Sequence, residues 1–279
     1  MRNEGDSMYI LMNGQLIGEG EGHLSPSGEA LFYGYGLFET LKYHNKKIFF
    51  LREHLERLTL GCRKLDLQLK IEEALIEEWA YQLIQANQLP TGTLKITCIK
   101  SQDHVDVILS IRKNVYTNKD YEQGFKLCFT EVKRNPYSIL TYIKSNNYLE
   151  NLLVRKEALA QGYHEVVFTN VHGKICEGAI SNIFFVREGI LYTPAVECGI
   201  LEGIMRNKIL EIARGLDLRV EAGGYTEEDL LKAEEVFITN SLLEIMPVVE
   251  IEGKQFNLHK NIVTQTLRKQ YEDYIGAQQ

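Results

Sequence analysis

Several features that define other protein classes are missing from this 279-residue sequence. No apolar run approaches the roughly 20 residues that a membrane-spanning helix requires, and residues 1–7 are polar rather than apolar like a signal peptide. The five cysteines are dispersed and include no CxxC pair, and the seven histidines do not cluster. These absences argue against a membrane protein, a disulfide framework and a metal site, and they favour reduced thiols in a cytoplasm.

Positive charge is also scarce. The chain has 31 basic and 38 acidic residues, a net charge of −7 and no basic run, so nucleic-acid binding is disfavoured. An apolar content of 44% and a charged content of 25% are typical of an ordinary globular protein. The length suffices for one large domain or two domains of ordinary size.

What the sequence does contain is a mixture of short strands and amphipathic helices. Asn13-Gly14 lies between two apolar stretches and predicts a tight hairpin, because both residues tolerate a positive φ. Leucines at helical spacing predict a helix over residues 51–65, and alternating residues predict paired strands over 93–99 and 105–111. Further strands are expected over 125–130, 165–169, 183–186, 190–192 and 235–239, and further helices over 71–87, 149–161, 203–215, 226–232 and 261–274.

Short hairpin-linked strands without regular βαβ alternation favour an α+β fold over a Rossmann fold. Residues 113–123 are polar and aperiodic, which indicates a connection between domains. We therefore expect a smaller α+β domain over residues 1–114 and a larger one over residues 121–279, joined by a linker over 115–120. Residues 1–7 are expected to form a loose extension before the first strand.

Lys144 stands between an apolar pair and polar residues that favour a helix start. Ser145 and Asn146 are good capping residues, so the pattern predicts a strand-to-helix junction with the lysine at the turn. A lysine with a fixed backbone and a mobile side chain suits a nucleophilic amine that reaches a carbonyl and then acts as a base. A solvated surface lysine is the alternative, since lysines are rarely buried.

Three later stretches also have chemistry-bearing compositions. Residues 177–182 place a carboxylate beside a glycine just before an apolar strand. Residues 199–206 form a glycine-punctuated turn into a helix, whose first amides would make an anion site. Residues 239–241, Thr-Asn-Ser, follow a strand and supply hydroxyl and amide donors. Each stretch alone is explained equally well as a surface turn, a helix start or a loop cap.

Taken together, these motifs resemble the fold-type IV pyridoxal phosphate enzymes, the family of branched-chain aminotransferase, D-amino acid aminotransferase and aminodeoxychorismate lyase. The resemblance runs from about Met8 to the C-terminal helix. It implies pyridoxal 5'-phosphate as cofactor, a small-molecule amine substrate and a homodimer with the cofactor between the two domains of each subunit. The landmarks occur in family order: Gly34–Glu39, His54–Leu58, Lys144, Glu177-Gly178 with Ser181-Asn182, Gly203–Arg206, and Thr239–Ser241 with Glu244–Val248.

The resemblance also implies roles for individual residues around the cofactor ring. Lys144 would hold the cofactor covalently and later shuttle the proton on the substrate carbon. Glu177 would pair with the pyridine nitrogen and keep it protonated. Tyr148 would bond the ring hydroxyl, although it is equally suited to packing.

A second set of residues is assigned to the cofactor phosphate by the same resemblance. The Arg57 guanidinium would match the phosphate oxygens as a planar fork. The amides of Ile204 and Met205 at a helix start, with the Ser241 hydroxyl, would complete the phosphate site.

Three details resemble aminodeoxychorismate lyase, which releases pyruvate and 4-aminobenzoate for folate synthesis. Thr40 matches the proton-handling threonine of the lyases. The Thr239–Ser241 loop is closer to the lyase form, and the four-residue interval from Lys144 to Tyr148 is one shorter than the branched-chain pattern.

One departure from the lyase pattern concerns the substrate carboxylate. The loop Lys100–His104 lacks the arginine that lyases often carry there, so Lys100, Arg112 or a residue of a partner subunit would have to substitute. The alternatives are an aminotransferase acting on branched-chain or D-amino acids, which would share the cofactor site, and a non-catalytic binder of pyridoxal phosphate.

Overall fold

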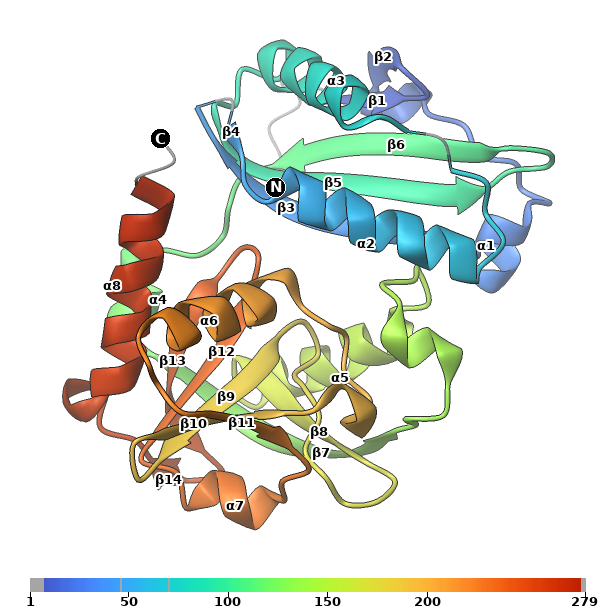
Figure 1. The fold of residues 1–279 in the computed structure, drawn as a ribbon. Coiled ribbons are helices and arrows are strands. Elements are labelled where there is room, and N and C mark those ends of the chain that lie inside the picture. The colour runs from blue at the N-terminus through green and yellow to red at the C-terminus, as the bar shows by residue number, and fades with distance from the viewer. Residues whose placement is uncertain (1–7, 46, 70, 277–279) are drawn as a thin grey trace. The chain divides into compact units, whose positions relative to one another are not determined.

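The computed structural model describes residues 8–45, 47–69 and 71–276 (Figure 1). The loose extension expected over residues 1–7 therefore lies outside the described residues. The chain forms two compact units. Unit 1 comprises Met1–Val115 with Ile143–Asn147, and unit 2 comprises Tyr116–Tyr142 with Tyr148–Gln279. In the described ranges, no helix is long and apolar enough to cross a membrane.

Unit 1 is built on an antiparallel sheet with the strand order β2-β1-β6-β5-β3-β4. The Asn13-Gly14 hairpin is confirmed, since both residues have positive φ, 51° and 84°, between β1 and β2. The elements of unit 1 are β1 (Tyr9–Met12), β2 (Gln15–Gly18), η1 (Glu19–Glu21), α1 (Glu29–Tyr33), β3 (Gly36–His44), β4 (Lys47–Ile48), α2 (Leu51–Lys64), α3 (Glu73–Ala86), β5 (Thr91–Lys100) and β6 (Val105–Arg112).

Helices α2 and α3 cover one face of this sheet (Figure 1), because their apolar side chains share a core with the strands. Leu58 of α2 and Ile76 of α3 join Leu41 and Leu94, each of them at most 2% exposed. Burial of a side chain of this size stabilises the fold by about 1.5–3 kcal/mol. Because strand side chains alternate, the intervening residues of β3, β5 and β6 project from the other face.

Unit 2 contains a mixed sheet with the order β11-β10-β9-β12-β13-β7-β8, with β14 beside β13. The pairs β10–β11, β13–β7 and β7–β8 are parallel, and the other pairs are antiparallel. Its elements are α4 (Asn118–Gln123), β7 (Phe125–Arg134), η2 (Ile139–Tyr142), α5 (Leu149–Ala160), β8 (Glu165–Asn170), β9 (Asn182–Arg187), β10 (Ile190–Pro194), η3 (Val196–Cys198), α6 (Ile204–Gly215), β11 (Val220–Gly223), α7 (Glu227–Leu231), β12 (Glu235–Asn240), β13 (Glu244–Ile251), β14 (Lys254–Gln255), η4 (Leu258–Lys260) and α8 (Ile262–Gly276).

The α+β prediction is confirmed, but two local predictions were wrong. Part of the segment expected to be an irregular connection forms α4, which begins after Thr117. The Thr117 N–H and hydroxyl both donate to Asp120 Oδ2, at 2.7 and 2.8 Å, and this capping arrangement starts a helix in a polar sequence.

The second error concerns the junction at Lys144. The residues before it form the 3-10 helix η2 rather than a strand, whereas α5 begins at Leu149 as predicted. Lys144 lies in an extended piece of chain that pairs with the start of β3. The Phe38 N–H donates to the Lys144 carbonyl and the Asn146 N–H donates to the Gly36 carbonyl, both at 2.9 Å. These bonds place Lys144 in unit 1, although the chain on either side belongs to unit 2.

Candidate active site

The Lys144 side chain lies over an aromatic ring of the sheet to which its backbone is bonded. Its Nζ is 4.7 Å from the centroid of the Phe38 ring, and the Nζ of Lys95 on β5 is at the same distance from that ring. A cation over an aromatic face is attracted by the ring quadrupole. The two ammonium groups are therefore no more than twice that distance apart, and both belong to unit 1.

On the helix-covered face of unit 1, the buried carboxylate of Glu39 binds two side chains of α2. Arg57 donates from Nε to Oε1 at 2.8 Å and from Nη2 to Oε2 at 2.6 Å. His54 Nδ1 lies 2.6 Å from Oε2. The two partners are three positions apart on α2, so both lie on the side of the helix that faces β3.

The charges of this cluster are set by burial and by the pairing itself. Burial alone would raise the pKa of Glu39, but the Arg57 guanidinium and the His54 ring beside it bring that pKa down to about 2. Burial lowers the pKa of His54, against the opposing effect of Glu39. His54 is therefore neutral near pH 7, and it donates its Nδ1–H to the ionised carboxylate.

Arg57 was assigned to the cofactor phosphate, and this assignment stays a prediction. Its contacts with Glu39 use the Nε and one Nη2 proton, which are two of the five N–H donors of a guanidinium. The pairing fixes the plane of the guanidinium, because two parallel bonds to one carboxylate leave it little rotational freedom.

In unit 2, Glu177 and Asn182 tie together the two segments that carry the other predicted residues. Glu177 Oε2 accepts the Leu201 N–H at 3.0 Å and Asn182 Nδ2 at 3.3 Å. Asn182 Nδ2 also donates to the Leu201 carbonyl at 2.9 Å. The Glu177 carboxylate is thereby held in one orientation, as a partner for a ring nitrogen must be.

The N-terminus of α6 has the composition of an anion site. Gly203 precedes the helix with ψ 138° and has no side chain to cap it, and a Cβ there would overlap Asn182 Oδ1. The first amides, those of Ile204 and Met205, therefore point out of the helix without a side-chain cap. Arg206 is 4% exposed, and its Nε has no hydrogen-bond partner within the described ranges. The two amides are donors of the kind that a phosphate group accepts.

The side chain of Asn240 stabilises the turn that carries Ser241. Asn240 Oδ1 accepts the N–H of Leu242 at 2.8 Å and of Leu243 at 2.9 Å, and its Nδ2 donates to the Ile180 carbonyl at 3.0 Å. The turn that carries Ser241 is thus tied to the loop of residues 177–182.

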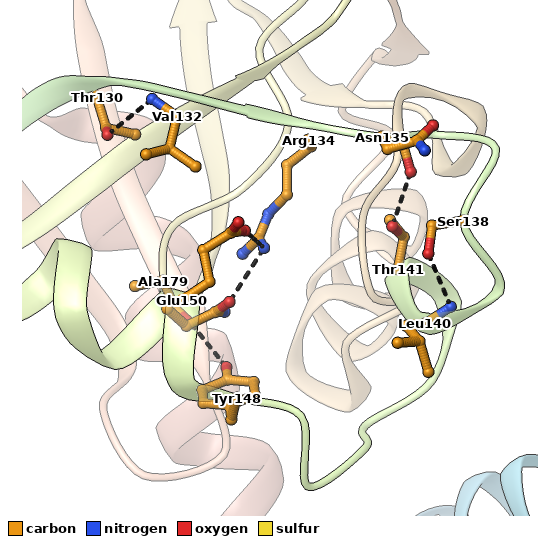
Figure 2. A network of polar contacts seen from close by, with 11 residues as sticks. Thr130, Val132, Arg134, Asn135, Ser138, Leu140, Thr141, Tyr148, Glu150 and Ala179 are labelled. Carbon is orange, nitrogen blue, oxygen red and sulfur yellow. Dashed lines mark hydrogen bonds and ion pairs between the residues drawn. The ribbon is translucent and has the colours of Figure 1, made fainter. Parts of the chain in front are cut away.

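Tyr148 belongs to a polar network that a single sequence does not reveal (Figure 2). Its hydroxyl donates to the Ala179 carbonyl at 2.6 Å, and Asn151 Nδ2 donates to the same oxygen at 2.7 Å. Arg134 Nη1 donates to Asn151 Oδ1 at 3.0 Å and to Glu150 Oε1 at 3.2 Å. The expected bond from Tyr148 to the ring hydroxyl stays a prediction, and packing against the loop is what the structure shows.

The loop of residues 177–182 is also held by Glu165, another residue that sequence reasoning missed. Its carboxylate accepts the N–H of Ala179 at 3.1 Å and of Ile180 at 3.2 Å, and the Ser181 hydroxyl at 3.2 Å. Burial raises the pKa of Glu165, while its amide donors oppose that shift. Only the position of this glutamate at the start of an apolar strand, β8, would have signalled such a role.

The predicted residues fall into two sets. In unit 1, Thr40 projects from the face of β3 that carries Phe38, the ring beneath the Lys144 ammonium, whereas Arg57 contacts the opposite, helix-covered face through Glu39. Glu177, Tyr148, Ile204, Met205 and Ser241 lie in unit 2, where the polar contacts described above connect the segments that carry them.

The sequence profile described as Amino-transferase class IV matches residues 36–251, which is most of the chain. The chain belongs to the class IV aminotransferase family. The predicted family is therefore confirmed. Its cofactor is confirmed as well, since class IV aminotransferases are pyridoxal phosphate enzymes and a similar branched-chain amino acid aminotransferase is solved with pyridoxamine 5'-phosphate.

Relatives within the class IV aminotransferase family differ in the reaction they catalyse. Aminodeoxychorismate lyase of Bacillus subtilis (strain 168) is 28% identical over 283 residues, covering 95% of this chain and 94% of the relative. D-alanine aminotransferase of Bacillus licheniformis is 27% identical, covering 92% and 95%. The branched-chain aminotransferase of the thermophilic archaeon Thermoproteus uzoniensis, solved with norvaline, has a TM-score of 0.87 at 28% identity, covering 95% of this chain and 94% of that one. Similarity fixes the family but not the reaction.

The pKa of Glu39 predicts how stability depends on pH. A carboxylate whose folded pKa is about 2 and whose ordinary value is 4.5 stabilises the fold fully above pH 4.5, and this contribution is lost as the pH falls towards 2. The difference in unfolding free energy between the wild type and Glu39→Gln should therefore shrink by about 2 kcal/mol between pH 7 and pH 3. Urea unfolding at pH 7, 5 and 3 measures it.

A matched control for this experiment lies on the same helix. Glu56→Gln changes an exposed glutamate of α2 and should keep the pH profile of the wild type. An identical pH profile for wild type and Glu39→Gln would contradict the assigned role of the buried carboxylate.

Proposed function

We propose that this enzyme is a 4-amino-4-deoxychorismate lyase that releases pyruvate and 4-aminobenzoate, a reaction of folate synthesis. The observation that carries the proposal is the position of Thr40. Its side chain projects from the same face of β3 as Phe38, the residue over whose ring the Lys144 ammonium lies. A hydroxyl is thus held on the lysine-bearing side of the strand.

In this proposal, the cofactor is bound by the residues that the family resemblance indicates. Lys144 binds it covalently through Nζ and moves the proton of the substrate carbon, and Glu177 keeps the ring nitrogen protonated. When bound, pyridoxal phosphate takes up the electron pair left on that carbon.

The phosphate of the cofactor is assigned to a second group of donors. Arg57, oriented by Glu39, supplies a guanidinium, and the amides of Ile204 and Met205 supply the positive end of α6. The Ser241 hydroxyl completes the group in the proposal.

Thr40 serves the step in which a lyase differs from a transaminase. Elimination has to expel enolpyruvate, and a hydroxyl placed to pass a proton to this leaving group would favour elimination over transamination. Across the strand pair, Thr40 is in register with Lys95, so the hydroxyl lies beside a cation that would attract an anionic leaving group.

The second candidate is an aminotransferase acting on branched-chain or D-amino acids. The similarity to D-alanine aminotransferase of Bacillus licheniformis and to the branched-chain aminotransferase of Thermoproteus uzoniensis supports it. It uses the same lysine and carboxylate, so only the products separate the two: pyruvate with 4-aminobenzoate, or a new amino acid.

We also propose that the enzyme is a homodimer and works in the cytoplasm. Helix α5 leaves Leu149, Leu152 and Leu153 each more than half exposed on one side, and an apolar patch of this kind marks an interaction surface. All five cysteines are buried free thiols, which suits a reducing compartment.

The homodimer is tested by placing charge on α5. The wild type should sediment at twice its 32.1 kDa chain mass, whereas Leu152→Glu with Leu153→Glu should sediment as a monomer, because two carboxylates would have to be desolvated. Leu60→Glu, which alters an exposed leucine of α2, should remain dimeric. A wild type of 32.1 kDa in sedimentation equilibrium would contradict this proposal.

Covalent attachment of the cofactor tests the role of Lys144. Borohydride reduction of the holoenzyme, followed by peptide mapping, should place the pyridoxyl group on Lys144. Lys95→Arg should leave the label there, because Lys95 is the other amine near the Phe38 ring. A pyridoxyl group on Lys95, or on any other lysine, would overturn the assignment.

The reaction itself is tested with Thr40→Val, which keeps the shape and removes the hydroxyl. Wild-type enzyme should release pyruvate from aminodeoxychorismate, and the variant should do so roughly 10²- to 10⁴-fold more slowly with unchanged cofactor absorbance. Thr97→Val is the control. Thr97 lies on the neighbouring strand β5, on the same face of the sheet as Thr40, and this variant should release pyruvate at the wild-type rate. No pyruvate, together with brisk transamination of amino acids, would establish the second candidate instead.

A further inference from the structure

Two side chains at the start of α5 donate to the same buried carbonyl in unit 2. The Tyr148 hydroxyl donates to the Ala179 carbonyl oxygen at 2.6 Å, and Asn151 Nδ2 donates to that oxygen at 2.7 Å. Ala179 is 1% exposed and Asn151 is 7% exposed, so this contact is shielded from water. Because a carbonyl oxygen has two lone pairs, the two donors together use its whole accepting capacity.

The orientation of the Asn151 amide is fixed by Arg134. Arg134 Nη1 donates to Asn151 Oδ1 at 3.0 Å, and a guanidinium has donors only, so the amide oxygen must face it. The Nδ2 hydrogens are thereby directed towards the Ala179 carbonyl. Arg134 is itself held in place, since its Cζ lies 3.9 Å from the centroid of the Phe168 ring. Its Nη1 also donates to Glu150 Oε1 at 3.2 Å (Figure 2).

Tyr148, by contrast, is a donor whose proton is free to turn. Burial raises the pKa of Tyr148, and the carboxylates of Glu177 and Glu165 raise it further, so the phenol keeps its proton near pH 7. A hydroxyl hydrogen rotates to suit its partner, and the family resemblance assigns the ring hydroxyl of the cofactor as a second partner. If the proton turned away, the Ala179 carbonyl would still accept from Asn151. Without Asn151, the same rotation would take both of these donors from a buried carbonyl, which is unfavourable.

We propose that Asn151 is a positioning residue of the pyridoxal phosphate site and acts through Tyr148. By keeping one hydrogen bond on the Ala179 carbonyl, Asn151 allows the Tyr148 hydroxyl to donate to the ring oxygen of the cofactor instead of to the backbone. This role requires no contact between Asn151 and the cofactor. The inference rests on the predicted bond from Tyr148 to the ring hydroxyl, and it is independent of whether the enzyme is a lyase or an aminotransferase.

The absorbance of the bound cofactor reports on this hydrogen bond. A bond donated to the ring oxygen favours its ionised form, so the oxygen competes less strongly for a proton. Loss of the bond should therefore raise the pH at which the absorbance of the cofactor changes. A residue that only stabilises the fold would change the unfolding temperature and leave this midpoint where it is.

Spectral titration of the holoenzyme tests the inference without any substrate. Asn151→Leu has nearly the same shape and removes the amide donor, so it should raise the pH midpoint of the absorbance change by about one unit. Tyr148→Phe removes the hydroxyl and should raise the midpoint at least as far. Adding Asn151→Leu to Tyr148→Phe should produce no further rise, because the effect of Asn151 passes through the hydroxyl.

Two further variants separate the amide donor from packing. Asn151→Asp keeps the shape and the acceptor for Arg134 but lacks the donor, so it should also raise the midpoint, and it serves in place of Asn151→Leu if that variant does not fold. Glu150→Gln is the matched control, because Glu150 contacts Arg134 as Asn151 does but is more than half exposed. It should titrate like the wild type.

Three results would overturn the inference: an unchanged midpoint in both Asn151 variants, an equally large rise from Asn151→Leu in the Tyr148→Phe background, or a Tyr148→Phe midpoint equal to that of the wild type. The lyase proposal is judged separately, by the release of pyruvate from aminodeoxychorismate. A holoenzyme that releases no pyruvate but shows the shift in Asn151→Leu would remove the lyase proposal and support the role of Asn151.

Discussion

The structure depends on a pair of backbone hydrogen bonds between the chain around Lys144 and the first residues of β3. They hold the Lys144 carbonyl against the Phe38 N–H and the Asn146 N–H against the Gly36 carbonyl. The approach is possible only at a glycine, since a Cβ at position 36 would lie 2.5 Å from the Cys98 carbonyl oxygen. Through these bonds, a short segment leaves unit 2, joins the sheet of unit 1 and returns. The predicted nucleophile is thereby fixed to the strand that carries Phe38, Glu39 and Thr40.

Strand β3 presents different chemistry on its two faces. Towards α2 it places Glu39, whose carboxylate is fully engaged by Arg57 and His54. Towards the other side it places Phe38 and Thr40 beside the two ammonium groups. The pleat of one strand thus orients the guanidinium proposed for the phosphate and, on its opposite face, the hydroxyl proposed for the proton. A register shift of one residue would exchange the two faces and abolish both arrangements.

In unit 2, the carboxylates of Glu165 and Glu177 mainly accept hydrogen bonds from backbone N–H groups of neighbouring loops. Glu165 accepts two amides and a hydroxyl of the loop of residues 177–182, and Glu177 accepts an amide of the segment before α6. Buried carboxylates are costly unless their oxygens are satisfied, and here most of the donors are backbone N–H groups. The result is a rigid loop. Its Ala179 carbonyl also accepts hydrogen bonds from the Tyr148 hydroxyl (Figure 2) and from the Asn151 side-chain amide. Rigidity of this kind suits a site that has to hold a ring in one orientation.

The sequence by itself determined the hairpin at Asn13-Gly14, most helices and strands, the α+β class, and the family with its cofactor. These follow from turn chemistry, from periodicity within short windows, and from motifs in a fixed order along the chain. The pairing of Glu39 with Arg57, the approach of Lys95 to Phe38, and the return of Lys144 to unit 1 were decided only by the tertiary structure. Each depends on strand register or on contacts between residues far apart in the chain, and local propensity contains no information about such distances.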